Sequence, residues 1–387
     1  MENSSNQRSN LGEPPTGDGQ IHRRARLIAF YLPQYHPIPE NDAWWGKGFT
    51  EWRVVASARP LFPGHRQPIL PGELGFYDLR VPEVREAQAE LAQQHGIEAF
   101  CYWHYWLGNG KRLLERPFTE VLRSGKPHFS FCLGWANHSW KGVFFGAGGR
   151  TLIEQLYPGL EDYRAHFELL LQAFSDPRYL TVDGKPLMFI YAPRFLPDPV
   201  ALTDTWRELA HRAGLKGLFI VGGGGEPHDR LSKLGFDANA YSRQRICESL
   251  RPKSKPQVLL SDAYRRLMHR PTICSYAKGM QHFLRPGAVP LADFPSIVPN
   301  WDNTPRLGAE GIVMHGSNPE LFRQHVKDVL DRIAYKPFEM RIAFIKSWNE
   351  WAEGNYIEPD SKFGRQYLEA LQSEVVLSDL PKSNAVS

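Results

Sequence analysis

The segment 347–359 carries the residue types best suited to chemistry. Two glutamates, Glu350 and Glu353, stand three residues apart there beside Trp348 and Trp351. A carboxylate next to indole rings is poorly solvated, so its pKa rises toward the range of a general acid, and the rings offer flat faces for a sugar. A surface loop with two solvated carboxylates is the alternative, because most glutamates are exposed. The segment therefore predicts a carbohydrate-processing pair, with Glu350 and Glu353 as candidate catalytic residues.

Alternating strands and helices must position this pair. Apolar runs predict eight strands, at residues 26–32, 99–103, 129–133, 187–191, 218–221, 236–240, 294–298 and 342–345. Amphipathic stretches predict helices at residues 82–95, 111–124, 162–174, 203–213, 319–334 and 363–373. Continuous apolar runs are typical of parallel strands buried on both faces. Eight such repeats predict an α/β fold, a single (β/α)8 TIM-type barrel with long strand-end loops, rather than a doubly wound sheet.

The 387 residues divide into one domain and two tails. We expect residues 25–375 to form the barrel, residues 1–24 a disordered N-terminal tail and residues 376–387 a C-terminal tail. The first 20 residues are polar and rich in Ser, Asn, Gly and Pro, a composition typical of disorder. Residues 241–293 are basic and irregular, which predicts an insertion or long loop after the sixth strand.

Composition excludes several classes of function. The net charge of +4 comes from scattered residues, so nucleic acid is not an expected partner. No window approaches 18 apolar residues and no apolar leader is present, so we expect neither a transmembrane segment nor a secretory signal, but a cytoplasmic protein. The four cysteines lack C-x-x-C spacing, and Cys101 and Cys132 fall in apolar runs as reduced core residues.

Aromatic and polar side chains gather where the predicted strands end, the place where a β/α barrel builds its active site. Ten of the eleven tryptophans fall in these segments, and only Trp206 lies in a predicted helix. Indole faces stack on sugars and short polar side chains hydrogen-bond hydroxyls, so we expect a saccharide pocket. Aromatic residues that cap the barrel are the alternative, which fits single residues but not the set. The candidate substrate-binding residues are Tyr31, Gln34, His36, Trp44, Trp45, Glu51, Trp52, Tyr102, His104, Trp106, Trp135, Asn137, His138, Trp140, Trp301, Asp302, Asn303, Asn349 and Trp351.

Metal and cofactor binding are not expected from this set. The histidines His36, His104 and His138 lack paired i, i+4 spacing or a cysteine partner, so hydrogen bonding in a pocket is their better interpretation. The sequence thus predicts no metal and no cofactor.

Five motifs resemble WbsX-type proteins: FYLPQYHP at 30–37, WWGKGFTEW at 44–52, LGFYDLR at 74–80, WDNTPR at 301–306 and NEWAEG at 349–354. The resemblance covers roughly residues 25–375. Proteins of this type occur in bacterial polysaccharide and O-antigen (lipopolysaccharide) gene clusters and are often labelled glycosyltransferases. Their fold and Glu-Trp-x-Glu-Gly motif are similar to glycoside hydrolase family 99, the endo-acting α-mannosidases and mannanases.

The resemblance implies a role for each glutamate. Glu350 would act as the base toward the substrate 2-hydroxyl, which attacks the anomeric carbon through a 1,2-anhydro intermediate, and Glu353 would be the general acid and then base. Positions three apart in a strand face opposite sides, so the chain must curl after Glu350, and Gly354 permits this. His138 departs from the family pattern, which is acidic there; it implies a different or charged sugar and a group that titrates near neutral pH.

Three functions remain open. The first is a glycoside hydrolase-like enzyme with a retaining mechanism, acting on an α-linked bacterial polysaccharide or its precursor. Its partner would be an oligo- or polysaccharide, either free or lipid-linked. The second is a glycosyltransferase of surface-polysaccharide synthesis, although the chain has no D-x-D triplet and the nearest pattern is Glu358-Pro359-Asp360. The third is a non-catalytic carbohydrate-binding protein on a barrel scaffold.

Overall fold

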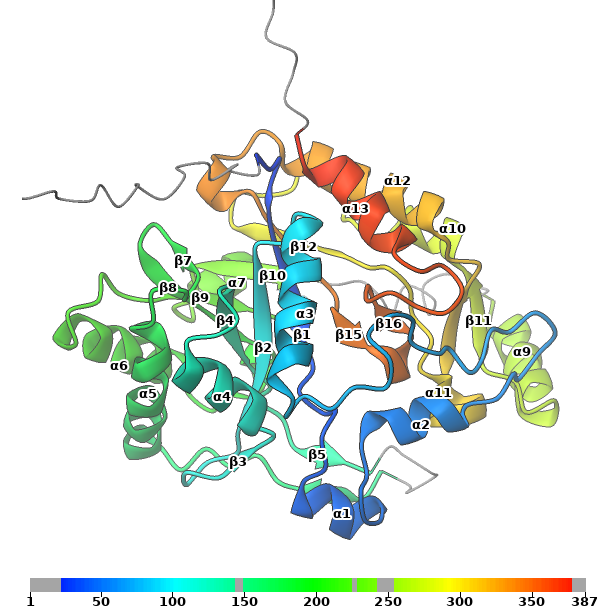
Figure 1. The fold of residues 1–387 in the computed structure, drawn as a ribbon, viewed down its shortest axis with the longest axis horizontal. Helices are drawn as coiled ribbons and strands as arrows, with labels where there is room; N and C mark the ends of the chain where they lie inside the picture. Colours follow the sequence, from blue (N-terminus) through cyan, green and yellow to red (C-terminus); the bar gives the residue numbers. More distant parts are fainter. Residues whose placement is uncertain (1–21, 143–148, 225–227, 242–253, 378–387) are drawn as a thin grey trace, which may run out of the picture.

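Figure 1 shows the computed structural model of the chain, which describes residues 22–142, 149–224, 228–241 and 254–377. Residues 1–21 of the predicted disordered tail, residues 378–387 of the predicted C-terminal tail, and Cys247 lie outside the described residues. The two ends of the described chain pair with each other. The Arg24 N–H donates to the Val375 carbonyl at 2.8 Å, and the Leu377 N–H donates to the His22 carbonyl at 2.8 Å.

Eight parallel strands form a closed barrel, which confirms the predicted (β/α)8 architecture. The strands are β1 (Arg26–Tyr31), β2 (Ala99–Trp106), β4 (Ser130–Trp135), β8 (Lys185–Ile190), β9 (Phe219–Gly222), β10 (Ala238–Tyr241), β12 (Asp293–Ile297) and β14 (Ile342–Ile345). Each strand pairs with its successor, and β1 pairs in parallel with both β2 and β14, which closes the ring.

Helices follow most strands and cover the outside of the barrel (Figure 1). They are α3 (Pro82–Gln94), α4 (Arg116–Ser124), α5 (Leu160–Phe174), α6 (Pro199–Arg212), α7 (His228–Ser232), α12 (Pro319–Ile333) and α13 (Gln366–Val375). The starts of α6 and α12 are fixed locally, since the Asp198 and Asn318 side chains accept from the N–H groups of Ala201 and Leu321 and a proline follows each cap. The helix predicted at 111–124 begins later because β3 (Arg112–Leu113) pairs antiparallel with the end of β2.

Aromatic rings fill the barrel interior. The Phe30 ring stacks on Trp103 at 4.7 Å and on Phe344 at 5.1 Å between centroids, and it meets Phe189 edge-on at 4.9 Å. Each of these side chains comes from a different strand, so the layer is a packed core and not a channel. Side chains that lie between this layer and the carboxyl ends of the strands therefore face the strand-end loops.

Short elements decorate those ends, and α1, α2, β3 and β5 gather at the lower side of Figure 1, where β1 and β2 end. They comprise α1 (Pro39–Trp45), α2 (Glu51–Ser57), β5 (Trp140–Lys141), β6 (Thr151–Ile153), α11 (Thr304–Leu307), β15 (Asn349–Glu350) and β16 (Asn355–Tyr356). The predicted insertion after the sixth strand holds α9 (Lys255–Leu267), β11 (Thr272–Ser275) and α10 (Tyr276–Met280), and β11 pairs with β13 (Ile312–His315). The remaining elements are β7 (Thr181–Val182) and the 3-10 helices η1 (Pro193–Phe195), η2 (Gly308–Glu310), η3 (Phe338–Met340) and η4 (Trp351–Glu353).

Cys101 and Cys132 are free and buried, as predicted, whereas Cys274 takes part in a disulfide bond that its spacing did not indicate. Within the described ranges, no helix combines the length and the apolar character needed to cross a bilayer. The cytoplasmic location stays a prediction.

Candidate active site

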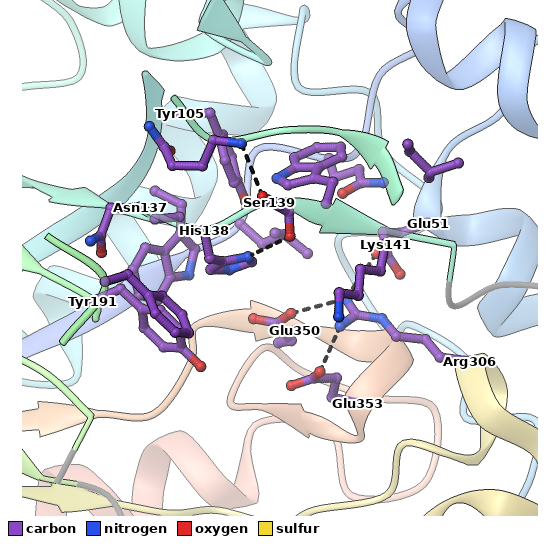
Figure 2. A pocket seen from close by; sticks show the side chains of 18 of the residues that line it. Glu51, Tyr105, Asn137, His138, Ser139, Lys141, Tyr191, Arg306, Glu350 and Glu353 are labelled. Carbon is purple, nitrogen blue, oxygen red and sulfur yellow. Dashed lines mark hydrogen bonds and ion pairs between the residues drawn. The ribbon is translucent and has the colours of Figure 1, made fainter. Parts of the chain in front are cut away.

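A cavity of about 790 Å³ opens at the carboxyl ends of the barrel strands (Figure 2). Both candidate catalytic residues line it, although they are three positions apart. Of the candidate substrate-binding residues, the ones that line it are Gln34, Trp45, Glu51, Asn137, His138 and Trp140.

A tight curl brings Glu350 and Glu353 to the same cavity. Glu350 ends β15, η4 turns the chain, and Gly354 adopts a left-handed conformation with φ 59° before β16 returns. A Cβ on Gly354 would lie 2.8 Å from the Cβ of Asp302, so both the backbone conformation and the space require glycine. This is the curl that the three-residue spacing demands.

Arg306 joins three carboxylates into one group, which we call the Arg306 cluster (Arg306, Glu51, Glu350 and Glu353; Figure 2). Its guanidinium donates to Glu353 at 2.6 Å, to Glu51 at 2.8 Å and to Glu350 at 2.9 Å. Glu51 begins α2 and Arg306 lies in α11, so loops after the first, seventh and eighth strands meet here. One cation therefore holds three acidic groups that would otherwise repel each other.

Burial raises carboxyl pKa values in this cluster. The Glu51 side chain is fully buried, and desolvation raises its pKa to about 7, although Arg306 opposes the shift. Desolvation also raises the pKa of Glu353, where Arg306 again opposes and the Glu350 charge adds to the effect. Carboxyl groups whose pKa is raised and which lie in a cavity are suited to general acid–base chemistry.

Glu358, the third glutamate of the same segment, sits in a different environment, which we call the Glu358 network (Glu358, Tyr77, Gln88 and Trp351). The Trp351 indole and the Gln88 amide each donate to the Glu358 carboxylate at 2.6 Å, and the Tyr77 hydroxyl donates at 2.8 Å. Burial raises the pKa of Glu358 to about 7. This network fixes Trp351 between the two cavity glutamates.

Asn349 and Asp302 support the curl from outside the cavity. The Asn349 side chain accepts from the Leu32 N–H at 2.7 Å and donates to the Leu32 carbonyl at 3.0 Å, which ties β15 to the end of β1. The Asp302 N–H donates to the Glu353 carbonyl at 2.6 Å, and its carboxylate is held by His65 and Gln67, each at 2.8 Å. Both residues are placed to position the glutamates.

Three candidates on β2 face away from the cavity, while Trp103 and Tyr105 line it. Side chains alternate along a strand, so Tyr102, His104 and Trp106 share the opposite face. His104 lies 2.9 Å from His166 (Nε2 to Nε2) in α5, and the Trp106 indole donates to Asp162 at 2.9 Å.

The other candidates pack around the cavity without lining it. Tyr31 donates to Gln88, Trp52 to the Tyr77 carbonyl and Trp135 to the Trp106 carbonyl. Asn303 accepts from the Ile312 N–H, and the His36 ring contacts the Pro33 carbonyl. Trp44 packs on Trp140. Trp301 belongs to a separate apolar cluster with Tyr276 and Phe283.

His138 and Asn137 line the cavity with distinct roles. Burial lowers the pKa of the His138 ring, although its hydrogen bond with the Ser139 carbonyl opposes this shift. The ring lies 5.3 Å from Tyr191, between centroids. The Asn137 amide instead bridges the backbone of Ala192, donating to its carbonyl at 2.9 Å and accepting from its N–H at 2.8 Å.

Sequence reasoning did not select several cavity residues, including the three cations. These residues are Leu32, Trp103, Tyr105, Ala136, Ser139, Lys141, Leu152, Gln155, Tyr157, Tyr191, Phe195, Arg306 and Lys346. Of these, Arg306 stands in the WDNTPR motif. Leu152, Gln155 and Tyr157 come from the β5–β6 region, which carries no motif. Across the described residues, no group of three or more His, Cys, Asp or Glu side chains is arranged to hold a metal ion.

Comparisons with known proteins agree with this architecture. The family model described as glycosyltransferase WbsX matches residues 27–371. The uncharacterized protein WxcX of Xanthomonas campestris pv. campestris is 38% identical over 362 residues in strain ATCC 33913 and 39% identical over 351 residues in strain B100. Each match covers 89% of this chain but 49% of the relative, so the chain spans about half the length of these relatives.

Solved structures share the fold at low sequence identity. A glycoside hydrolase-like protein superposes with a TM-score of 0.56 and 16% identity, covering 94% of this chain and 98% of the other. The family 99 endo-α-mannosidase of Bacteroides thetaiotaomicron superposes with a TM-score of 0.54 and 15% identity, covering 90% and 95%. The resemblance inferred from the motifs is confirmed: the chain belongs to the WbsX family, on a barrel like that of glycoside hydrolase family 99.

Proposed function

We propose that this chain is a carbohydrate-active enzyme that opens an α-glycosidic bond in a bacterial polysaccharide or its precursor, with retention of configuration. The convergence of Glu350 and Glu353 on one cavity with aromatic walls carries the proposal. The likeness of the barrel to family 99 is consistent with it but is a likeness of fold.

In the proposed first step Glu350 takes the proton of the sugar 2-hydroxyl, and that oxygen attacks the anomeric carbon. The glycosidic bond breaks as Glu353 gives its proton to the departing oxygen, which leaves a 1,2-anhydro sugar. Glu353 then takes a proton from an incoming hydroxyl, which opens the anhydro ring, and Glu350 returns its proton to the 2-oxygen. Two inversions at one carbon retain its configuration.

Arg306 suits both stages of this cycle. Its guanidinium stays bonded to both catalytic carboxylates, at 2.9 Å from Glu350 and 2.6 Å from Glu353, and so favours their charged forms. Desolvation acts in the opposite direction and raises the pKa of Glu353, which a proton donor needs. Trp45, Trp140 and Tyr191 line the same cavity and supply apolar faces for the sugar.

Product analysis tests this function directly. Purified protein is incubated with the surface polysaccharide and the lipid-linked precursors of its host, with and without sugar nucleotides. We expect shortened glycans without any nucleotide, and loss of this activity in Glu353→Gln but not in Glu86→Gln, an exposed glutamate on α3. Full activity of Glu353→Gln on every substrate would contradict the proposal.

Glycosyl transfer is the second candidate because the family model carries a glycosyltransferase description. The same activated sugar can be delivered to water or to another hydroxyl. Glycans lengthened only when a sugar nucleotide is present would make the protein a transferase. Sugar binding that survives Glu350→Gln together with Glu353→Gln, with no turnover by the unmodified chain, would instead make it a binding protein.

A further inference from the structure

Lys346 stands at the floor of the cavity, directly after β14. Its side chain is half-buried and lines the cavity. Its ammonium lies 6.0 Å from the centroid of Phe30, one of the rings that close the barrel interior. The lysine therefore rises from the aromatic layer into the space where a sugar would bind.

Lys346 differs from Arg306 in its partners. The three cavity carboxylates all bond to Arg306, whereas Lys346 makes no ion pair with any carboxylate of the described residues. An aromatic face is a weak partner for an ammonium compared with a carboxylate or phosphate. A charge held away from bulk water without an opposite charge is unfavourable, so the site is better satisfied with an anion present.

Lys141 adds a second ammonium to the same cavity. It comes from β5 and is exposed, and in the described part of the chain it also has no carboxylate partner (Figure 2). The cavity is thus lined by three carboxylates, which all bond to Arg306, and by two lysines that pair with no carboxylate of the described residues and can bind an anionic ligand.

We propose that the cavity binds an acidic sugar, and that Lys346 holds its carboxylate or phosphate group with Lys141 near the entrance. This rests on the proposed saccharide-processing function and narrows its substrate class. The competing role for Lys346 is to stabilise the Glu353 carboxylate, since its charge acts to lower the pKa of Glu353. The two roles differ in one observable: only an anion-binding lysine distinguishes acidic from neutral sugars.

The test measures binding and not turnover, so it is separate from the test of catalysis. Calorimetry follows the unmodified protein with methyl α-hexosides, with the matching methyl α-hexuronides, and with hexose 6-phosphates. A charged hydrogen bond in a half-buried site predicts about tenfold tighter binding of at least one acidic sugar than of its neutral parent. Comparing uronides with phosphates identifies which acid is recognised.

Three variants assign the effect. We expect Lys346→Gln to reduce the preference to within about twofold, while Lys346→Arg, which keeps the charge, retains it. Lys233→Gln is the matched control, because Lys233 is exposed and does not line the cavity. Thermal unfolding checks that each variant is folded.

Two results would overturn the inference. The inference is wrong if the unmodified chain binds acidic and neutral sugars with equal affinity, or binds neither. An equal loss of both in Lys346→Gln would make Lys346 a positioning residue for Glu353. A preference for acidic sugars in a protein that turns over no glycan would support the inference while removing the proposed catalysis.

Discussion

The Arg306 cluster and the Glu358 network occupy the same strand-eight segment, yet they hold buried carboxylates by different means. In the Arg306 cluster three carboxylates share one cation and line a cavity. In the Glu358 network one carboxylate accepts from an indole, an amide and a hydroxyl, all neutral, and does not line the cavity that holds Glu350 and Glu353.

This difference separates a site for chemistry from a structural anchor. Each oxygen of the Glu358 carboxylate accepts at least one hydrogen bond from a neutral donor, so no group of a substrate is needed there. The Arg306 cluster has more acceptors than its single guanidinium can satisfy: the second oxygen of Glu51 is buried with no hydrogen-bond partner among the described residues. A buried acceptor of this kind is available to a hydroxyl group of a bound sugar.

Activity should separate the two regions most strongly. We expect Glu353→Gln to lower kcat by about 10²- to 10⁴-fold, the usual contribution of general acid–base catalysis. Glu358→Gln should keep kcat within about threefold once the folded fraction is accounted for, because Glu358 does not line the cavity. Steady-state rates on a cleaved glycan measure both, and equal losses would remove the distinction.

The second largest effect should follow from removing the shared cation. Arg306→Gln leaves three carboxylates without their partner, and loss of one member of a buried ion pair costs about 3–5 kcal/mol. The cost should be greater at pH 8 than at pH 5, where Glu51 and Glu353 can take up protons. Urea unfolding at the two pH values tests this, and a pH-independent loss would contradict the shared-charge account.

A smaller loss of stability is expected from Glu358→Gln. A glutamine presents an NH2 group to one of the three donors, and a buried donor left without an acceptor costs about 1–3 kcal/mol. Glu73→Gln serves as the control, since Glu73 pairs with Arg365 at an exposed position. Denaturant unfolding with equal losses in both variants would mean that the network does not anchor the segment.

The smallest expected effect is on the pH dependence of the free energy of unfolding. The pKa of Glu51 is raised to about 7 in the folded chain, so the folded state keeps a proton that the unfolded state releases above about pH 4.5. Stability should therefore fall as pH rises from about 4.5 to 7, by up to about 1.4 kcal/mol per pH unit for this group. Glu51→Gln should remove the part of this pH dependence that comes from Glu51. The part that comes from Glu358, whose pKa is also raised to about 7, should remain. An unchanged slope would show that Glu51 ionises normally.

The fold was predictable because its signals are local. The eight apolar runs correspond to the eight barrel strands, and the predicted bounds of the last strand match β14. The insertion after the sixth strand was visible only as irregular sequence, since each residue of β11 pairs with a residue of β13 that lies 40 positions later in the chain. Long-range pairing of this kind leaves no periodicity in either segment.

The candidate site was harder to predict than the fold. Strand β2 is aromatic on both faces, so its sequence has no polar–apolar alternation to show that Trp103 and Tyr105, and not Tyr102 and His104, face the cavity. Arg306 and Lys346 were overlooked for another reason. Their importance comes from the carboxylates and rings that the fold gathers around them, which a linear motif does not reveal.

The pairing of the two ends of the described chain has a consequence for protein engineering with this barrel. Arg23 and Val376 form a bridge just before β1 begins, at the end of the barrel opposite the carboxyl ends of the strands. A short linker there would join the first and last β/α units into an uninterrupted ring, so circular permutants opened at other exposed loops should fold to the same barrel. A module fused at either end would likewise leave the path from solvent to Glu350 and Glu353 open.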